Sequence, residues 1–249
     1  MLSKDETVDK ILRGKISIIQ LKKGYRYGFE AVFLAAFVNG YLKKFKKKNF
    51  SLVDVGSGVG TISLIIAYKN NGANISAIEN NDYFLENANR NILKNNFQKK
   101  INSIKGDIFN IDSYLINSFD IVVTNPPFYD QKQKKSENEL DNYAKRIIDY
   151  ESWIENSLKL LKDKGIIFII IPTGLIEKSL KILNKKTGSV KIFPIWPNHK
   201  KSSKRLILFA KKGGASPTEL MSGIRLLNNE GKITKKARTY SENGIFNFL

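Results

Sequence analysis

Three alternate glycines lie between an apolar segment of the chain and a helical one. Residues 50–55 have the apolar pattern of a short strand, and residues 61–68 have the pattern of a helix. Gly56, Gly58 and Gly60 make the turn between them. Glycine is needed where the backbone passes so close to a ligand that a Cβ would collide with it. The third glycine comes one residue earlier than in the Gly-x-Gly-x-x-Gly of dinucleotide-binding proteins, which argues against NAD.

Acidic residues stand at the carboxyl ends of the strands predicted next. A strand over residues 74–79 ends in Glu79, which can accept hydrogen bonds from both hydroxyls of a ribose. A third predicted strand ends shortly before Asp107 and Ile108. Asp107 can accept a hydrogen bond from an adenine amine while Ile108 packs on the ring; a helix cap is the alternative interpretation of Asp107. The ribose and the adenine would belong to one bound cofactor, and Asp54, just before the glycines, is expected to orient it.

A fourth predicted strand, over residues 119–124, leads directly into the sequence Asn-Pro-Pro-Phe. Pro126 and Pro127 fix the backbone just past the strand. The amide oxygen of Asn125 and a nearby backbone carbonyl can then accept both protons of a planar amino group. Phe128 offers a ring on which a base can stack. The plainer interpretation is that the prolines only end a strand and that the glycines form an ordinary turn.

Together the two motifs resemble those of the S-adenosylmethionine-dependent methyltransferases that act on exocyclic amino groups: adenine N6, cytosine N4, guanine N2 or a protein glutamine. Residues 25–36 resemble the N-terminal cofactor lid of one branch of these enzymes, which places Tyr27 or Phe29 beside the cofactor. No cofactor other than S-adenosylmethionine is implied. Its predicted binding residues are Tyr27, Asp54, Gly56, Gly58, Gly60, Glu79, Asp107, Ile108 and Asn125, and the predicted catalytic residues are Asn125, Pro126, Pro127 and Phe128.

The resemblance extends over nearly the whole chain. Blocks such as the closing residues 226–234 are similar to the bacterial tRNA adenine-N6 methyltransferases that modify valine tRNA beside the anticodon. Residues 129–143 match little and are interpreted as a loop over the site. The implied reaction is N6-methylation of an unpaired adenine in tRNA. The alternatives are a protein-glutamine N5-methyltransferase, which can use the same motif on a side-chain amide, and a catalytically silent cofactor-binding RNA module.

The other segments supply the rest of one α/β domain. Residues 165–171 are uniformly apolar, which is typical of a central strand. Residues 190–196 and 204–210 are two further strands that a loop can join as an antiparallel hairpin. The resemblance implies a Rossmann-like, seven-stranded methyltransferase sheet with strand order 3-2-1-4-5-7-6 and the last strand antiparallel. We expect a single domain over residues 1–249, with an N-terminal hairpin or lid (1–28), a catalytic core (29–212) and a C-terminal extension (213–249).

Composition limits the chemistry and indicates the partner. The 249 residues include no cysteine and one histidine, which argues against thiolate and histidine metal sites. A net charge of +19 indicates a polyanionic partner, interpreted as nucleic acid, with lysine-rich codon usage as the alternative origin. The single histidine, His199, is expected to face solvent or RNA. The sequence has neither a signal peptide nor a membrane-spanning run, so we expect a cytoplasmic protein, with a monomer favoured.

Overall fold

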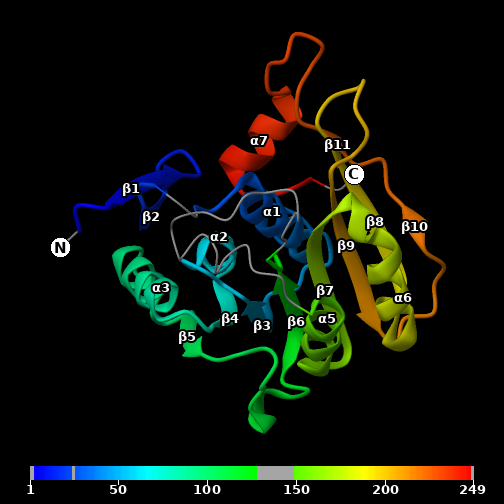
Figure 1. Cartoon of the computed structure of the whole chain (residues 1–249), viewed down its shortest axis with the longest axis horizontal. Coiled ribbons are helices and arrows are strands. Elements are labelled where there is room, and N and C mark those ends of the chain that lie inside the picture. Colours follow the sequence, from blue (N-terminus) through cyan, green and yellow to red (C-terminus); the bar gives the residue numbers. More distant parts are fainter. Residues whose placement is uncertain (1–2, 24–25, 128–148, 248–249) are drawn as a thin grey trace.

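The computed structural model describes residues 3–23, 26–127 and 149–247, which form an α/β fold (Figure 1). The strands are β1 (Glu6–Ile11), β2 (Ile16–Leu21), β3 (Asn49–Val55), β4 (Gly72–Glu79), β5 (Ile101–Lys105), β6 (Phe119–Thr124), β7 (Leu161–Pro172), β8 (Thr187–Trp196), β9 (Arg205–Lys212), β10 (Glu219–Leu220) and β11 (Ile224–Arg225). The helices are α1 (Phe29–Lys44), α2 (Thr61–Lys69), α3 (Asp82–Lys94), α5 (Tyr150–Lys159), α6 (Ile176–Lys186) and α7 (Lys235–Asn243), with 3-10 turns η1 (Ser113–Leu115) and η2 (Thr173–Leu175).

Within the described residues, one mixed sheet of nine strands forms the centre of the molecule. Its strands lie in the order β10-β8-β9-β7-β6-β3-β4-β5, and the short β11 also pairs with β8. Strands β3 to β7 are parallel to their neighbours among themselves, whereas β9 is antiparallel to both β7 and β8. The predicted Rossmann-like α/β class is confirmed. The sheet is larger than the predicted seven strands because β10 and β11 are added along β8.

Helices cover both faces of this sheet. α1 and α2 contribute to one apolar core, and α5 and α6 contribute to the other. β7 serves both cores, because Ile166 and Phe168 belong to the first while Ile167 and Ile169 belong to the second. Alternate side chains of a strand point to opposite faces, so a strand covered on both sides is apolar throughout. Of the helices in the described part of the chain, none combines the length and apolar character that a membrane crossing requires.

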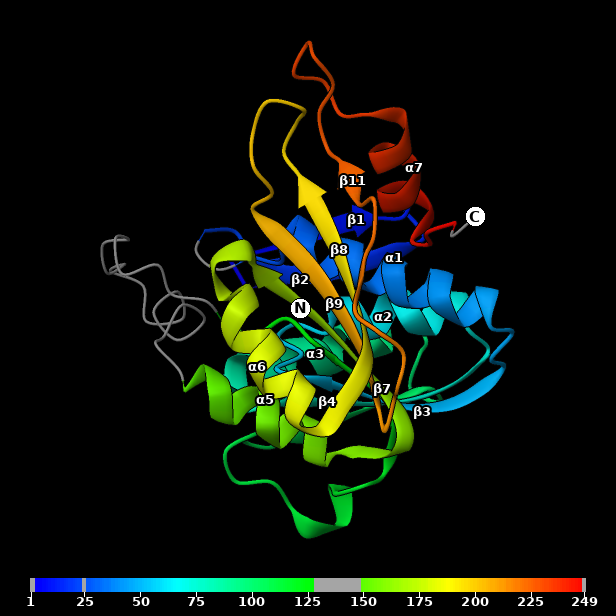
Figure 2. The same ribbon diagram turned by 90° about the vertical axis from the view of Figure 1, so that its right-hand side faces the viewer.

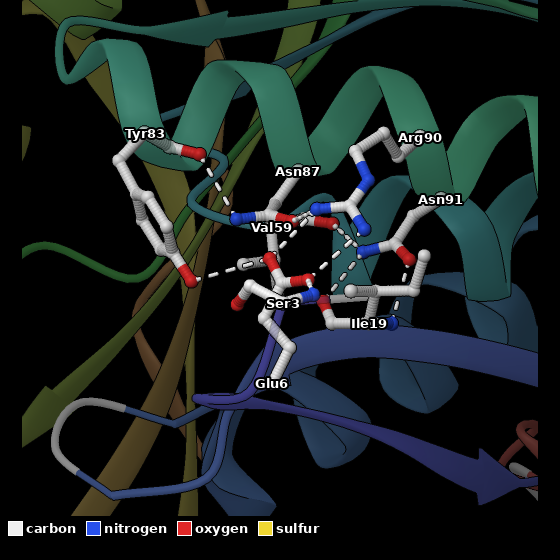
Figure 3. Close-up of polar contacts among 8 residues, drawn as sticks. All are labelled: Ser3, Glu6, Ile19, Val59, Tyr83, Asn87, Arg90 and Asn91. Atoms are coloured by element: carbon white, nitrogen blue, oxygen red, sulfur yellow. Dashed lines mark hydrogen bonds and ion pairs between the residues drawn. The ribbon is translucent and has the colours of Figure 1, made fainter. Parts of the chain in front are cut away.

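The hairpin β1-β2 is attached to α3 through polar side chains (Figure 3). The buried Asn91 accepts a hydrogen bond from the Ile19 amide at 2.7 Å, and its Nδ2 donates to the carbonyls of Ile19 and Val59, each at 3.0 Å. Arg90 donates to Glu6 at 2.6 Å, and Glu6 is itself buried. Since Val59 lies among the alternate glycines, Asn91 joins the hairpin to the glycine turn.

The C-terminal segment packs onto α1 after passing the end of β8 (Figure 2). Phe246 stacks on Tyr240 of α7 with ring centroids 4.1 Å apart. The same ring contacts Phe33 and Phe37 of α1 edge-on, with centroids 5.8 Å apart in each pair. The Phe246 amide also donates to the Ala36 carbonyl at 2.9 Å. These contacts hold α7 and the C-terminal segment against α1.

Candidate active site

A cleft opens at the edge of the sheet where the parallel strands β3, β4 and β6 end. β3 pairs with β4 on one side and with β6 on the other, so the residues that follow these strands meet at one place. The cleft encloses about 570 Å³, its open mouth included. The lining residues are Val55, Gly56, Gly58, Ile78, Glu79, Asn80, Phe84, Gly106, Asp107, Ile108, Asn125, Pro127 and Trp153.

The glycine turn presents bare backbone to this cleft. Gly56, Gly58 and Gly60 have φ values of +70°, +56° and +85°, in the left-handed region that favours glycine. The amides of Gly56 and Ser57 both donate to the Ile78 carbonyl at 3.0 Å, which fixes the turn to β4. A Cβ on Gly58 would meet no protein atom within 4 Å. A ligand can therefore approach the backbone at Gly58 directly.

Glu79 ends β4 inside the cleft with 5% of its surface exposed. Its Oε2 accepts a hydrogen bond from the Gly58 amide at 2.9 Å, and its Oε1 accepts one from the Asn81 amide at 2.8 Å. A carboxylate has about four acceptor sites, so these oxygens can also accept ribose hydroxyls. Two backbone amides thus hold the acid in place inside the cleft.

Asp107 and Ile108 line the cleft next to Asn80. Asp107 accepts from Asn80 Nδ2 at 2.8 Å through one oxygen and from the Phe109 amide at 3.0 Å through the other. A bridge between Asp107 and Asn110 follows rather than a helix, so the helix-cap interpretation of Asp107 is wrong. Ile108 is buried and provides an apolar surface of the cleft. This pairing of an acid with an apolar side chain fits an adenine ring and its amine.

Asn125 lies at the border between this cleft and a second cavity. The second cavity encloses about 450 Å³, its mouth included, between the glycine turn and a wall formed by Gln20, Tyr27 and Gly28. The Tyr27 amide donates to Gln20 Oε1 at 3.1 Å, which ties this wall to β2. Asn125 lines both spaces. Asn125 is therefore accessible from both spaces.

The remaining predicted site residues are divided by their positions. Pro127 lines the cleft, whereas Pro126 is buried and lines neither cavity. Asp54 and Gly60 also line neither cavity, and Gly60 is the residue just before α2. Phe128, the last residue of the motif, and residues 129–143, the predicted loop, lie outside the described residues.

Asp54 is fully buried below the glycine turn. One of its oxygens accepts a hydrogen bond from Ser63 Oγ at 2.8 Å, and the other has no partner within the described part of the chain. Burial raises the pKa of Asp54 to about 7. The carboxyl group therefore acts on the site by supporting the turn and the start of α2.

Trp153 of α5 is a part of the cleft that was not among the predicted site residues, because its position in the sequence fits an apolar helix face equally well. Its indole Nε1 donates to Thr124 Oγ1 at 3.0 Å, and that hydroxyl donates to the Val55 carbonyl at 2.9 Å. A Cβ on Gly56 would lie 3.0 Å from the indole ring. Trp153 thus packs against the glycine turn and links it to the strand that delivers Asn125. Asn80 was missed as well, because a single asparagine after a strand carries no specific pattern.

The fold and the cleft define an S-adenosylmethionine-dependent methyltransferase. Residues 39–194 match the family model described as "Methyltransferase small domain", and the chain belongs to that family. Solved structures with this fold hold S-adenosylmethionine, which is the cofactor of the chain. The bare backbone at Gly58 and the fixed carboxylate of Glu79 fit the adenosine part of that molecule.

Curated relatives and solved structures extend this comparison. A protein of Flavobacteriaceae bacterium (strain 3519-10), named tRNA1(Val) (adenine(37)-N6)-methyltransferase, is 26% identical over 233 residues, covering 92% of this chain and 91% of the relative. A release factor glutamine methyltransferase of Clostridium botulinum is 29% identical over 141 residues, covering 52% of this chain and 50% of the relative. The crystal structure of a predicted O-methyltransferase from Agrobacterium tumefaciens shares the fold, with TM-score 0.70 and 18% identity over 88% of this chain and 97% of that chain.

Proposed function

We propose that the chain methylates the N6 amine of an unpaired adenine in tRNA, with the adenine beside the anticodon of valine tRNA as the leading substrate. The observation that carries the proposal is the position of Asn125, which borders both the cofactor cleft and the cavity beside it. The relative that is similar over nearly its whole length and is named for this reaction supports the choice of substrate. A tRNA substrate is consistent with action in the cytoplasm.

Catalysis in this proposal consists mainly of positioning. When bound, S-adenosylmethionine supplies an electrophilic methyl group attached to sulfur. The Asn125 side-chain oxygen and a neighbouring backbone carbonyl of the motif accept the two protons of the adenine amine, so that the nitrogen lone pair is directed toward the cofactor cleft. Phe128 supplies a ring for stacking the base. Glu79 and the glycine turn hold the cofactor, and Asp54 supports the turn from below.

An unpaired base is proposed because an adenine must leave its stack before its amine can reach Asn125. Extrusion is least costly for a base that is already unpaired, as in the loops of folded RNA. The net charge of +19 favours a polyanion as the macromolecular partner. Free adenosine would lack these phosphate contacts and is expected to be a poor substrate.

Methylation of a protein glutamine is the second candidate, since a relative named for that activity matches about half of this chain. A glutamine side chain also presents a planar amino group that two carbonyl oxygens can hold. The net charge of +19 favours RNA, which carries phosphates, over a protein substrate. A silent RNA-binding module is disfavoured because Asn125 and Pro127 both line the cofactor cleft.

The test is to incubate the protein with labelled S-adenosylmethionine and either total tRNA or a release factor, and then to digest the products. We expect label in N6-methyladenosine from tRNA. Label in protein glutamine, or in a different nucleoside, would contradict the proposal. Label in N6-methyladenosine from another tRNA would keep the chemistry and contradict only the assignment to valine tRNA.

A further inference from the structure

A second and larger groove lies at the same edge of the sheet as the active-site cleft. It opens between the β8-β9 loop and the segment that leads into α7, and it encloses about 1320 Å³ with its mouth included. β8 and β7 are both antiparallel to β9, and β7 is parallel to β6, so β8 and β6 run in the same direction. The exit of β8 at Trp196 therefore lies on the edge where Asn125 follows β6.

This basic groove is lined by positive charges without acids among its lining residues. Cations next to it are neutralised: Arg205 pairs with Glu30 at 3.1 Å, and Lys232 pairs with Glu230 at 3.0 Å. Within the described residues, the cations that line the groove have no such carboxylate partner. They are all exposed, and they are Lys200, Lys201, Arg225 and Lys236.

The backbone that carries these cations is fixed by hydrogen bonds. Asn198 Oδ1 accepts from the amides of Lys200 and Lys201 at 3.0 and 3.1 Å, which shapes the tip of the β8-β9 loop. The Leu226 amide donates to the Trp196 carbonyl at 2.8 Å, which joins the opposite wall to the end of β8. Both walls of the groove are therefore attached to the end of β8, and the long cationic side chains extend from them into solvent.

The chemistry of the groove matches a nucleic-acid strand. Lysine and arginine side chains that lack acid partners bind phosphate through charge-assisted hydrogen bonds and release counterions. Trp196 lines the same groove and is half-buried, and its indole offers a face on which a base can stack. His199 also lines it, in agreement with its interpretation as a residue that faces solvent or RNA. An acidic peptide would use the cations but would leave the indole without a partner.

We propose that the basic groove binds the phosphate backbone of the RNA whose unpaired base reaches Asn125 at the border of the cofactor cleft. This inference rests on the proposed function, because it takes RNA as the substrate. β8 and β6 are three strand positions apart in the sheet, which corresponds to about 14 Å at roughly 4.8 Å per strand. A short run of nucleotides spans that distance, so one strand can occupy the groove while one of its bases reaches Asn125.

The test compares two triple variants that remove equal charge. K200Q/K201Q/R225Q removes three cations of the basic groove. K43Q/K44Q/K48Q removes three exposed lysines between the end of α1 and the start of β3, at the opposite edge of the sheet. For both variants and the unmodified protein, the dissociation constant for labelled tRNA is measured by filter binding from 50 to 200 mM salt. Calorimetry with S-adenosylmethionine confirms that each variant is folded.

The groove variant is expected to bind tRNA roughly tenfold more weakly at the lowest salt and to lower the slope of log affinity against log salt by about 2. The matched control is expected to change either quantity by much less. An equal loss in both variants, or unchanged tRNA binding in the groove variant, would overturn the inference. Competition by polyglutamate as strong as competition by RNA would also overturn it.

The outcome for the groove can be separated from the outcome for the proposed function, because binding is measured without turnover. If the protein binds tRNA through the groove but transfers the label to a protein glutamine, the proposed function is contradicted and the inference that the groove binds RNA is supported. If the groove variant methylates tRNA with unchanged KM and unchanged affinity, the proposed function is supported and the inference that the groove binds RNA is overturned.

Discussion

The active-site cleft and the basic groove lie at one edge of the same sheet, yet they are built differently. In the cleft, the Glu79 carboxylate is buried and held by the amides of Gly58 and Asn81 before a ligand arrives. In the groove, the backbone is fixed but Lys200 and Lys201 are exposed. The cleft therefore selects a ligand by fixed short-range geometry, whereas the groove attracts one by charge.

This difference determines how each site responds to its surroundings. Interactions inside a buried site are screened little by salt, and buried carboxyl groups can have strongly shifted pKa values. Exposed cations that contact phosphate lose affinity steeply as salt rises. The cleft should thus be sensitive to pH and to single buried substitutions, and the groove to ionic strength.

The largest expected effect concerns the buried support of the cleft. Burial raises the pKa of Asp54 to about 7, above the ordinary value of about 3.9. Between these pH values the unfolded chain has released the proton that the folded protein retains. The free energy of unfolding should therefore fall as pH rises from about 4 to about 7, by up to about 4 kcal/mol from this one group.

Asp54→Asn removes the titrating group while keeping an acceptor for Ser63. Urea unfolding of the unmodified protein and the variant at pH 5 and pH 8 should show that the variant loses much less stability between the two pH values. An equal pH dependence in both proteins would remove Asp54 from this role.

The next largest expected effect is a difference in salt dependence between tRNA binding and cofactor binding. If about four phosphates are contacted, raising salt from 50 to 200 mM should weaken tRNA binding by about 50-fold. Cofactor affinity, which depends on the buried contacts of the cleft, should change by less than about twofold over the same range. Parallel titrations with tRNA and with S-adenosylmethionine would check this. Equal salt dependence for the two ligands would contradict the division between the sites.

Loss of the fixed acid should affect the cleft alone. Glu79→Ala is expected to weaken S-adenosylmethionine binding by about 1.5 to 3 kcal/mol, because hydrogen bonds to a charged acceptor are lost. Affinity for tRNA at the groove should stay unchanged. Calorimetry measures the first quantity, and Glu86→Ala, an exposed acid on α3, is the matched control. Unchanged cofactor affinity in Glu79→Ala would remove this residue from the site.

The central strands and the glycine turn could be predicted because their patterns are local. The strand predicted over residues 50–55 is β3, Asn49–Val55, and the uniformly apolar run at 165–171 is the buried centre of β7. In both cases the nearly continuous run of apolar residues follows directly from burial on two faces. The two-residue strand β10 was missed, because its pairing with β8 depends on where a distant segment returns to the sheet.

The parts of the site that sequence reasoning missed depend on contacts between distant segments. Asn91 bonds to Ile19 and Val59, which are 72 and 32 positions away in the sequence. Trp153 bonds to Thr124 across 29 positions. An asparagine or a tryptophan on an amphipathic helix has no local feature that distinguishes such a role from an ordinary position. The assignments of the individual site residues and the division into lid, core and extension stay predictions.

The measurement that tests the central claim most directly is the rate at which Asn125→Ala forms N6-methyladenosine in tRNA under single-turnover conditions with saturating cofactor. The expected result is a rate at least about tenfold lower with unchanged cofactor affinity, because an interaction that orients the nucleophile acts mainly in the transition state. Asn125→Asp, which keeps the acceptor oxygens, should lose less. Formation of N6-methyladenosine by Asn125→Ala at the original rate would contradict the account.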